Sequence, residues 1–157
     1  MPDAVPPPLR AGTDRQALAE PAGVGPAREV VAGLAGLSRA SSVVNTTLIA
    51  TAARAWSANT IRAFLSDLRL WEAWCRHRGI AAAHAAPNDV ARYLREHGGI
   101  ERDPHAPIAR RSAATIERYL VSIGWAYRMA GTDSPTAAPL VRLELKAVRK
   151  AVGTRQR

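Results

Sequence analysis

The feature that most restricts the fold of this chain is the spacing of its apolar residues, which recur every three or four positions. That spacing places them along one side of an α-helix. The clearest helix is expected over 57–78, where Ser57 or Asn59 can cap the first turn and Gly79 follows as the stop. Its apolar stripe consists of Ile61, Phe64, Leu65, Leu68, Trp71 and Cys75. No segment alternates apolar and polar residues as a half-buried strand does, so the sequence predicts an all-α fold.

Three further helices are expected after the first one. They cover about 87–97, 112–130 and 139–152, and glycines follow the first two as stop signals. The segment 100–110 between two of them contains Pro104 and Pro107, and it is expected to be a loop because proline removes a backbone donor. The sequence therefore predicts four helices in its last two thirds.

The N-terminal part of the chain has a different composition. Six of the 11 prolines fall within residues 1–26, so residues 1–28 are expected to form a disordered leader. Residues 29–55 are apolar but small and β-branched, and they are expected to form a weakly helical lead-in of one or two short helices.

The charge of the chain points to a polyanionic partner. Lys and Arg number 22 against 13 Asp and Glu, for a formal net charge of +9. Residues 1–54 carry five basic and four acidic residues, so 17 basic and nine acidic residues remain for 55–157. Arginine dominates the basic residues, which suits forked contacts to phosphate and guanine, although GC-rich coding also produces such a bias. Nucleic acid is the simplest partner for this charge distribution.

Several classes of protein are excluded by what the sequence lacks. It has no phosphate-binding glycine loop and no His-Glu-x-x-His metal motif, so we expect no cofactor and no metal. The single cysteine, Cys75, forms no internal disulfide and is read as a core residue. No apolar run is long enough to span a membrane, and no signal peptide is visible, so a cytoplasmic protein is expected. The histidines are expected to be solvated or in loops, and the tryptophans to pack in the core, with Trp74 and Trp125 as alternative partner contacts.

Two of the expected helices carry a polar side rich in basic and hydroxyl residues. On the helix over 57–78 the polar side contains Arg62, Ser66, Arg69, Ala73 and Arg76. For the helix over 112–130 the polar side contains Arg111, Thr115, Arg118 and Ser122. A helix fits the DNA major groove, where hydroxyls contact phosphates or bases and arginine binds guanine. The alternative is that both polar sides are exposed to solvent and bind no partner.

The same segments resemble a known family. Ser57 to Phe64 (SANTIRAF), followed by Asp67-Leu68-Arg69 and Trp71 to Cys75 (WEAWC), resembles the first helix of the tyrosine recombinase (phage integrase) core-binding domain. The resemblance continues through 87–94 (PNDVARYL), 114–123 (ATIERYLVSI) and 145–150 (LKAVRK), and it covers about 57–153. It is strongest to the Cre and Xer branches of the family.

The resemblance implies a SAM-like bundle of four to five helices over 56–153, with 154–157 starting a linker to a second domain. In that family the bundle forms half of a clamp around double-stranded DNA, and its first and third helices face the major groove. Arg118 then becomes the candidate for a base contact, and Arg62, Arg69 and Arg111 become candidates for phosphate contacts. By position, the candidate DNA-binding residues are Asn59, Thr60, Arg62, Ser66, Arg69, Arg111, Thr115, Arg118, Ser122, Lys146, Arg149 and Lys150.

The resemblance also implies that the catalytic residues lie elsewhere. The family cuts DNA with an Arg, a Lys, a His-x-x-Arg motif and a Tyr in the second domain, and nothing in this chain matches those motifs. We therefore expect a role in DNA recombination and integration without catalysis by this chain itself. Two alternatives stay open: a helical protein–protein interaction module, and a truncated inhibitor of an intact recombinase. Homo-oligomers on DNA, or assembly with an intact recombinase, are further expectations.

Overall fold

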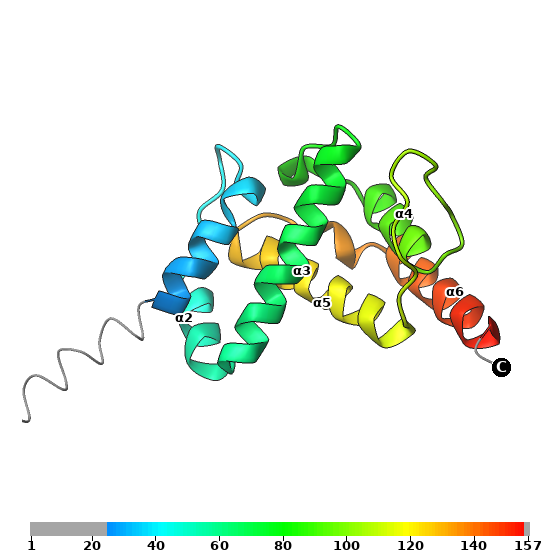
Figure 1. The fold of residues 1–157 in the computed structure, drawn as a ribbon. Coiled ribbons are helices and arrows are strands. Elements are labelled where there is room, and N and C mark those ends of the chain that lie inside the picture. Colours follow the sequence, from blue (N-terminus) through cyan, green and yellow to red (C-terminus); the bar gives the residue numbers. More distant parts are fainter. Residues whose placement is uncertain (1–24, 156–157) are drawn as a thin grey trace, which may run out of the picture.

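A computed structural model describes residues 25–155, and every regular element in that range is a helix. The predicted all-α fold is therefore confirmed for the described part of the chain (Figure 1). In chain order, helical residues 25–33 are followed by η1 (Ala35–Leu37), α2 (Thr46–Ala55), α3 (Ala58–His77), η2 (Ala82–His84), α4 (Pro87–His97), α5 (Ala113–Met129), η3 (Pro135–Ala137) and α6 (Pro139–Arg155). None of these helices is long and apolar enough to cross a membrane.

Local capping signals determine where the main helices begin and end. The Ser57 side chain accepts a hydrogen bond from the Thr60 amide at 3.1 Å, so Ser57 rather than Asn59 caps α3. Ser112 accepts from the Thr115 amide at 3.3 Å at the start of α5. Gly79 follows α3 with a φ of +66°, a conformation that favours glycine. These residues satisfy backbone groups that a helix leaves free at its ends.

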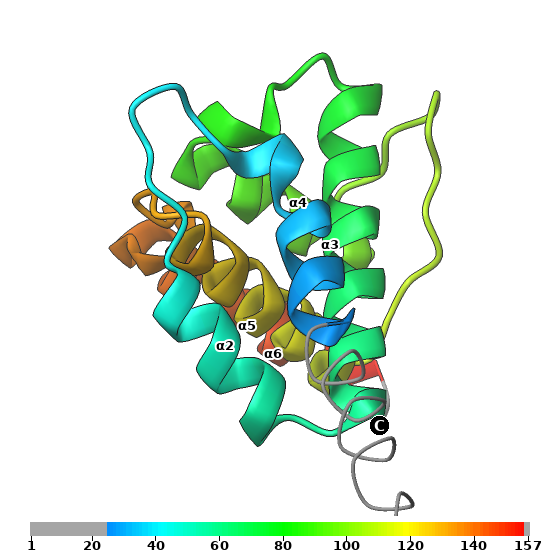
Figure 2. The same ribbon diagram turned by 90° about the vertical axis from the view of Figure 1, so that its left-hand side faces the viewer.

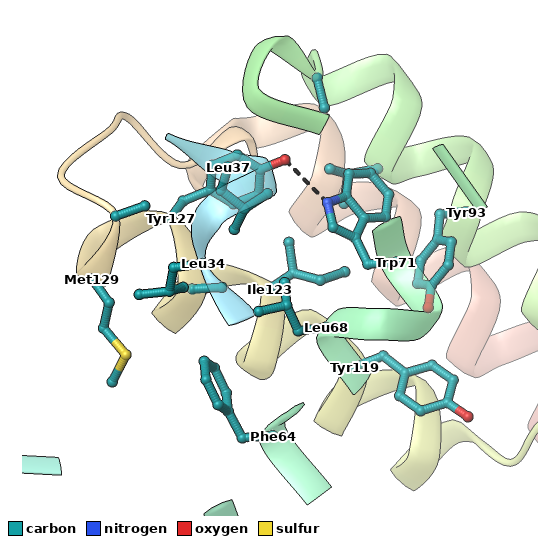
Figure 3. Packing of buried hydrophobic residues seen from close by; sticks show 14 of the residues in the cluster. Leu34, Leu37, Phe64, Leu68, Trp71, Tyr93, Tyr119, Ile123, Tyr127 and Met129 are labelled. Atoms are coloured by element: carbon teal, nitrogen blue, oxygen red, sulfur yellow. Dashed lines mark hydrogen bonds between the residues drawn. The ribbon is translucent and has the colours of Figure 1, made fainter. Parts of the chain in front are cut away.

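The four long helices pack mainly as two pairs, and the partners in each pair are not neighbours in the sequence. α3 lies across α5, and α4 packs along α6 (Figure 1). The buried core between them centres on Trp71, whose Nε1 donates to the Tyr127 hydroxyl at 3.0 Å (Figure 3). The Tyr127 hydroxyl donates in turn to the carbonyl of Ala82, and Tyr93 meets the Trp71 ring edge-on at 5.1 Å. The buried polar ends of Trp71 and Tyr127 are thus satisfied within the core, whereas the buried Tyr93 hydroxyl has no hydrogen-bond partner within the described residues.

The lead-in over 29–55 is part of this core. Val30, Leu34 and Leu37 are buried, and the helical segment 25–33 lies beside α3 and α2 (Figure 2). Residues 25–28, which were expected to belong to the disordered leader, are part of that helical segment. The rest of the predicted leader, residues 1–24, lies outside the described residues, as do 156–157 of the predicted linker.

Ion pairs attach the loop after α4 to its surroundings. Arg95 on α4 donates to Glu101 in the loop at 2.8 Å and to Glu144 on α6 at 3.0 Å. The buried carboxylate of Glu96 accepts from Arg92 at 3.0 Å and also pairs with Arg78. The predicted loop over 100–110 contains no helix, and it is held against α4 by these charges.

Candidate nucleic-acid interface

One side of α3 is exposed because the opposite side supplies the core. The candidate residues Asn59, Thr60, Arg62, Ser66 and Arg69 all lie on the exposed side. Arg62 and Arg69 are seven positions apart in the sequence, which is about two helical turns. Arg62 donates to the side-chain amide oxygen (Oδ1) of Asn59. The exposed side of α3 therefore presents a row of guanidinium groups.

Both acidic residues of α3 face away from that side. Asp67 is 2% exposed and lies against α5. Glu72 faces the lead-in, where a side chain at Gly36 would come within 3.1 Å of its Oε1. Burial raises the pKa of the Glu72 carboxyl, and the charge of Arg76 counteracts part of that effect. The exposed side of α3 consequently carries no acid of its own helix.

Arg118 on α5 is joined to α3 through Asp67. Its Nε donates to Asp67 Oδ2 at 3.1 Å, and its Nη2 donates to Oδ1 at 2.9 Å. The hydrogen bond to Asp67 raises the pKa of the Arg118 guanidinium further above its ordinary value. The Arg118 side chain is nevertheless 54% exposed, so it lies at the surface beside α3. Sequence reasoning missed Asp67 as a partner of Arg118.

Three of the candidate hydroxyl residues have structural partners. Ser122 is 7% exposed, and its hydroxyl donates to Asp67 Oδ2 at 2.8 Å. The helical periodicity placed Ser122 on the polar side of its helix, but α3 covers it there. Thr115 is half-buried, and its hydroxyl lies 3.0 Å from that of the cap residue Ser112. Thr60 has the same relation to Ser57, at 2.9 Å.

The remaining candidates lie at the start of α5 and on α6. Arg111 is exposed, and its amide donates to the carbonyl of His97 at 2.8 Å, which fixes the backbone in front of α5. Lys146, Arg149 and Lys150 are exposed on α6. Arg149 pairs with Glu117, the residue before Arg118, so the structure brings Arg149 beside α5. No ion pair within residues 25–155 links Lys146 to α3 or α5.

The burial of Cys75, Trp74 and Trp125 tests the predictions made for these three side chains. Cys75 is fully buried as predicted, and burial raises the pKa of its thiol to about 12. Trp74 is a core residue, stacked on Trp71, and it donates to Glu96 at 2.9 Å. It is therefore unavailable as the centre of a protein–protein contact. Trp125 is half-buried and meets Trp56 edge-on at 5.7 Å.

The prediction that the four histidines are solvated or in loops was wrong for His97, which is buried at the end of α4. His77, His84 and His105 are exposed, whereas His97 is 3% exposed. His97 continues the apolar spacing of Val90 and Tyr93 on α4, so the spacing itself could have indicated its burial. Within residues 25–155, no three His, Cys, Asp or Glu side chains lie where they could hold a metal ion together.

The all-helical fold is consistent with a SAM-like helical domain. Residues 50–130 match the family described as "Phage integrase, N-terminal SAM-like domain", which is just over half of the chain. The chain belongs to the tyrosine recombinase (phage integrase) family and carries its N-terminal core-binding domain.

A curated relative agrees with this assignment. It is an "Integrase/recombinase xerD homolog" of Selenomonas ruminantium, 25% identical over 99 residues, which are 63% of this chain and 27% of the relative. The chain thus spans about a quarter of the length of the relative it matches. No solved structure gives a significant match.

Proposed function

We propose that this chain is the DNA-binding core-binding domain of a tyrosine-type site-specific recombinase, and that it grips the major groove during DNA recombination and integration. The observation that carries the proposal is the exposed side of α3, where Arg62 and Arg69 stand two turns apart and both acids of the helix face elsewhere. Such a row of positive charge matches the phosphates that border a groove.

Within this proposal the exposed candidates divide into two roles. Arg62, Arg69 and Arg111 contact phosphates, because each is an exposed guanidinium on or next to a groove-facing helix. Arg118 contacts a base edge, supported by its fixed orientation beside α3. Asn59, Thr60, Ser66 and Thr115 supply hydrogen bonds along the same surface, and Lys146, Arg149 and Lys150 extend the positive charge onto α6. Ser122 is left out of the interface because it is buried.

We further propose that the chain does not cut DNA by itself. A tyrosine nucleophile must reach the phosphate that it attacks, and Tyr93, Tyr119 and Tyr127 are all buried. Burial is also the largest effect that raises the pKa values of the Tyr93 and Tyr127 hydroxyls. Assembly on DNA with further copies, or with an intact recombinase, is compatible with this role. An inhibitor of an intact recombinase would use the same DNA-binding surface.

The salt dependence of duplex binding tests the proposal. Fluorescence anisotropy of the chain on a labelled pool of random duplexes is measured across a salt series, for the wild type and for Arg62→Ala/Arg69→Ala. Each lost phosphate contact is expected to reduce the steepness of the log–log salt dependence by about 0.9. The control is Arg54→Ala/Arg142→Ala, which removes two exposed arginines from α2 and α6. Equal slopes for the two double variants would refute the assignment of DNA to α3.

A further inference from the structure

The Asp67 carboxylate connects the two helices of the proposed interface. It projects from α3, and it accepts three hydrogen bonds, two from the Arg118 guanidinium and one from the Ser122 hydroxyl. Because only 2% of Asp67 is exposed, the carboxylate is inaccessible to DNA itself. Any effect of Asp67 on DNA must therefore pass through Arg118, which is the one partner with an exposed side chain.

The ion pair with Asp67 occupies only one edge of the Arg118 guanidinium. A guanidinium has five N–H groups, and Asp67 uses the side edge formed by Nε and one hydrogen of Nη2. The other edge, where Nη1 and Nη2 each point an N–H outward, is not used by Asp67. That end-on edge is the fork that binds O6 and N7 of guanine in the major groove. The Arg118 side chain is also 54% exposed, so this fork has access to a ligand.

A second consequence concerns charge. The Asp67 carboxylate compensates the positive charge of Arg118, whereas Arg62 on α3 donates to the side-chain amide of Asn59 and has no ion pair within residues 25–155. The pair therefore adds little to the general attraction of phosphates. Its contribution to binding is directional, through hydrogen bonds that require a matching acceptor pair.

We propose that Asp67 is a positioning residue that holds Arg118 with its end-on fork directed at a guanine in the major groove. The proposal rests on the DNA-binding function proposed above. It states that the buried acid confers sequence preference without contacting DNA, because an arginine already held in one orientation loses less conformational freedom on binding.

The test begins with selection from a fully randomised duplex pool by the wild-type chain. The expected result is a binding site with a guanine at one position whose preference disappears in Arg118→Gln. Affinities are then compared on two duplexes that differ only by guanine or adenine at that position. In Asp67→Asn the preference for guanine is expected to fall on the order of tenfold, because the Arg118 fork is no longer held in one orientation. Glu72→Gln is the matched control, since it makes the same charge change on α3 and should keep the preference.

A double-mutant cycle separates positioning from a general structural effect. In the Arg118→Gln background, Asp67→Asn should change the guanine preference no further, because the residue that it positions is gone. An equal loss of affinity on both duplexes, or a further loss in that background, would overturn the proposal. If Asp67→Asn fails to fold by circular dichroism, Arg118→Lys replaces it: this variant keeps the charge beside Asp67 but lacks the fork, and retained guanine preference would overturn the proposal.

The outcome for the wild type distinguishes this inference from the function on which it rests. Steep salt-dependent binding without any base preference dependent on Arg118 would overturn the role of Asp67 and leave the DNA-binding function standing. A chain that binds no duplex at any salt concentration would overturn both.

Discussion

We predict that the buried His97 at the end of α4 makes the stability of this domain depend on pH. Its ring lies 4.3 Å from the ring of Tyr93 and 5.2 Å from that of Tyr119, and it is 3% exposed. Neither ring nitrogen has a hydrogen-bond partner within the described residues. Burial is the main cause that lowers the pKa of His97 to about 4, and the charges of Arg111 and Arg78 add to it.

The sign and size of the effect follow from this pKa. In the unfolded chain His97 takes up a proton near its ordinary value of about 6.5, whereas in the folded domain it does so near 4. Between these values the unfolded chain binds more protons, so the free energy of unfolding falls as the pH is lowered through this window. The difference of about 2.5 units corresponds to roughly 3 kcal/mol, lost fully below pH 4. Above about pH 7 His97 is neutral in both the folded and the unfolded state, so it no longer affects how the free energy of unfolding changes with pH.

Urea denaturation followed by circular dichroism at several pH values between about 7 and 4 measures this loss. In His97→Phe the loss should shrink by roughly 3 kcal/mol, because a phenyl ring in the same aromatic cluster takes up no proton. His84→Phe replaces an exposed histidine with the same residue and should keep the wild-type dependence, since His97 is still present. A His97→Phe domain whose stability falls with pH as steeply as the wild type would refute the reasoning.

Three further predictions concern packing. Gly131→Ala should lower the free energy of unfolding by at least ~2 kcal/mol in urea denaturation, because φ is +74° there and a Cβ would overlap the Val43 carbonyl; a loss under ~1 kcal/mol would contradict this. Tyr127→Phe should cost about 1–3 kcal/mol in the same assay, because the buried Trp71 Nε1 loses its acceptor, and a neutral effect would mean that another acceptor replaces the hydroxyl. Cys75 should react with an aromatic disulfide reagent at about pH 8 only after unfolding, since burial raises its pKa to about 12; rapid reaction of the folded chain would disprove its burial.

The helix boundaries could be predicted because the signals that set them are local. A cap residue and the amide that it binds are three positions apart, as in Ser57 with Thr60 and Ser112 with Thr115. The sequence predicted a helix over 57–78, and α3 covers Ala58–His77. Such local contacts can be predicted without knowing how the helices pack against one another.

The pairing of Asp67 with Arg118 could not be predicted from the sequence, because it depends on that crossing. The two residues are 51 positions apart, and each lies outside the apolar stripe of its helix. Periodicity located Asp67 correctly away from the stripe, yet α5 covers that side of α3. The burial of the lead-in was not predicted for a similar reason, since Val30 and Leu34 are buried by helices that come later in the chain.

The crossed arrangement of the helices has a consequence for how the chain reaches its folded state. α3 packs mainly on α5 and α4 on α6, so each helix finds its main partner two long helices further along, with another helix in between. Neighbouring helices therefore gain little by folding as isolated hairpins, because each main pair is joined by a stretch of chain that contains another helix. During synthesis from the N-terminus, α4 lacks its main partner until α6 has emerged. A nascent chain stopped before residue 139 would present the side of α4 that α6 covers in the folded domain to chaperones and proteases.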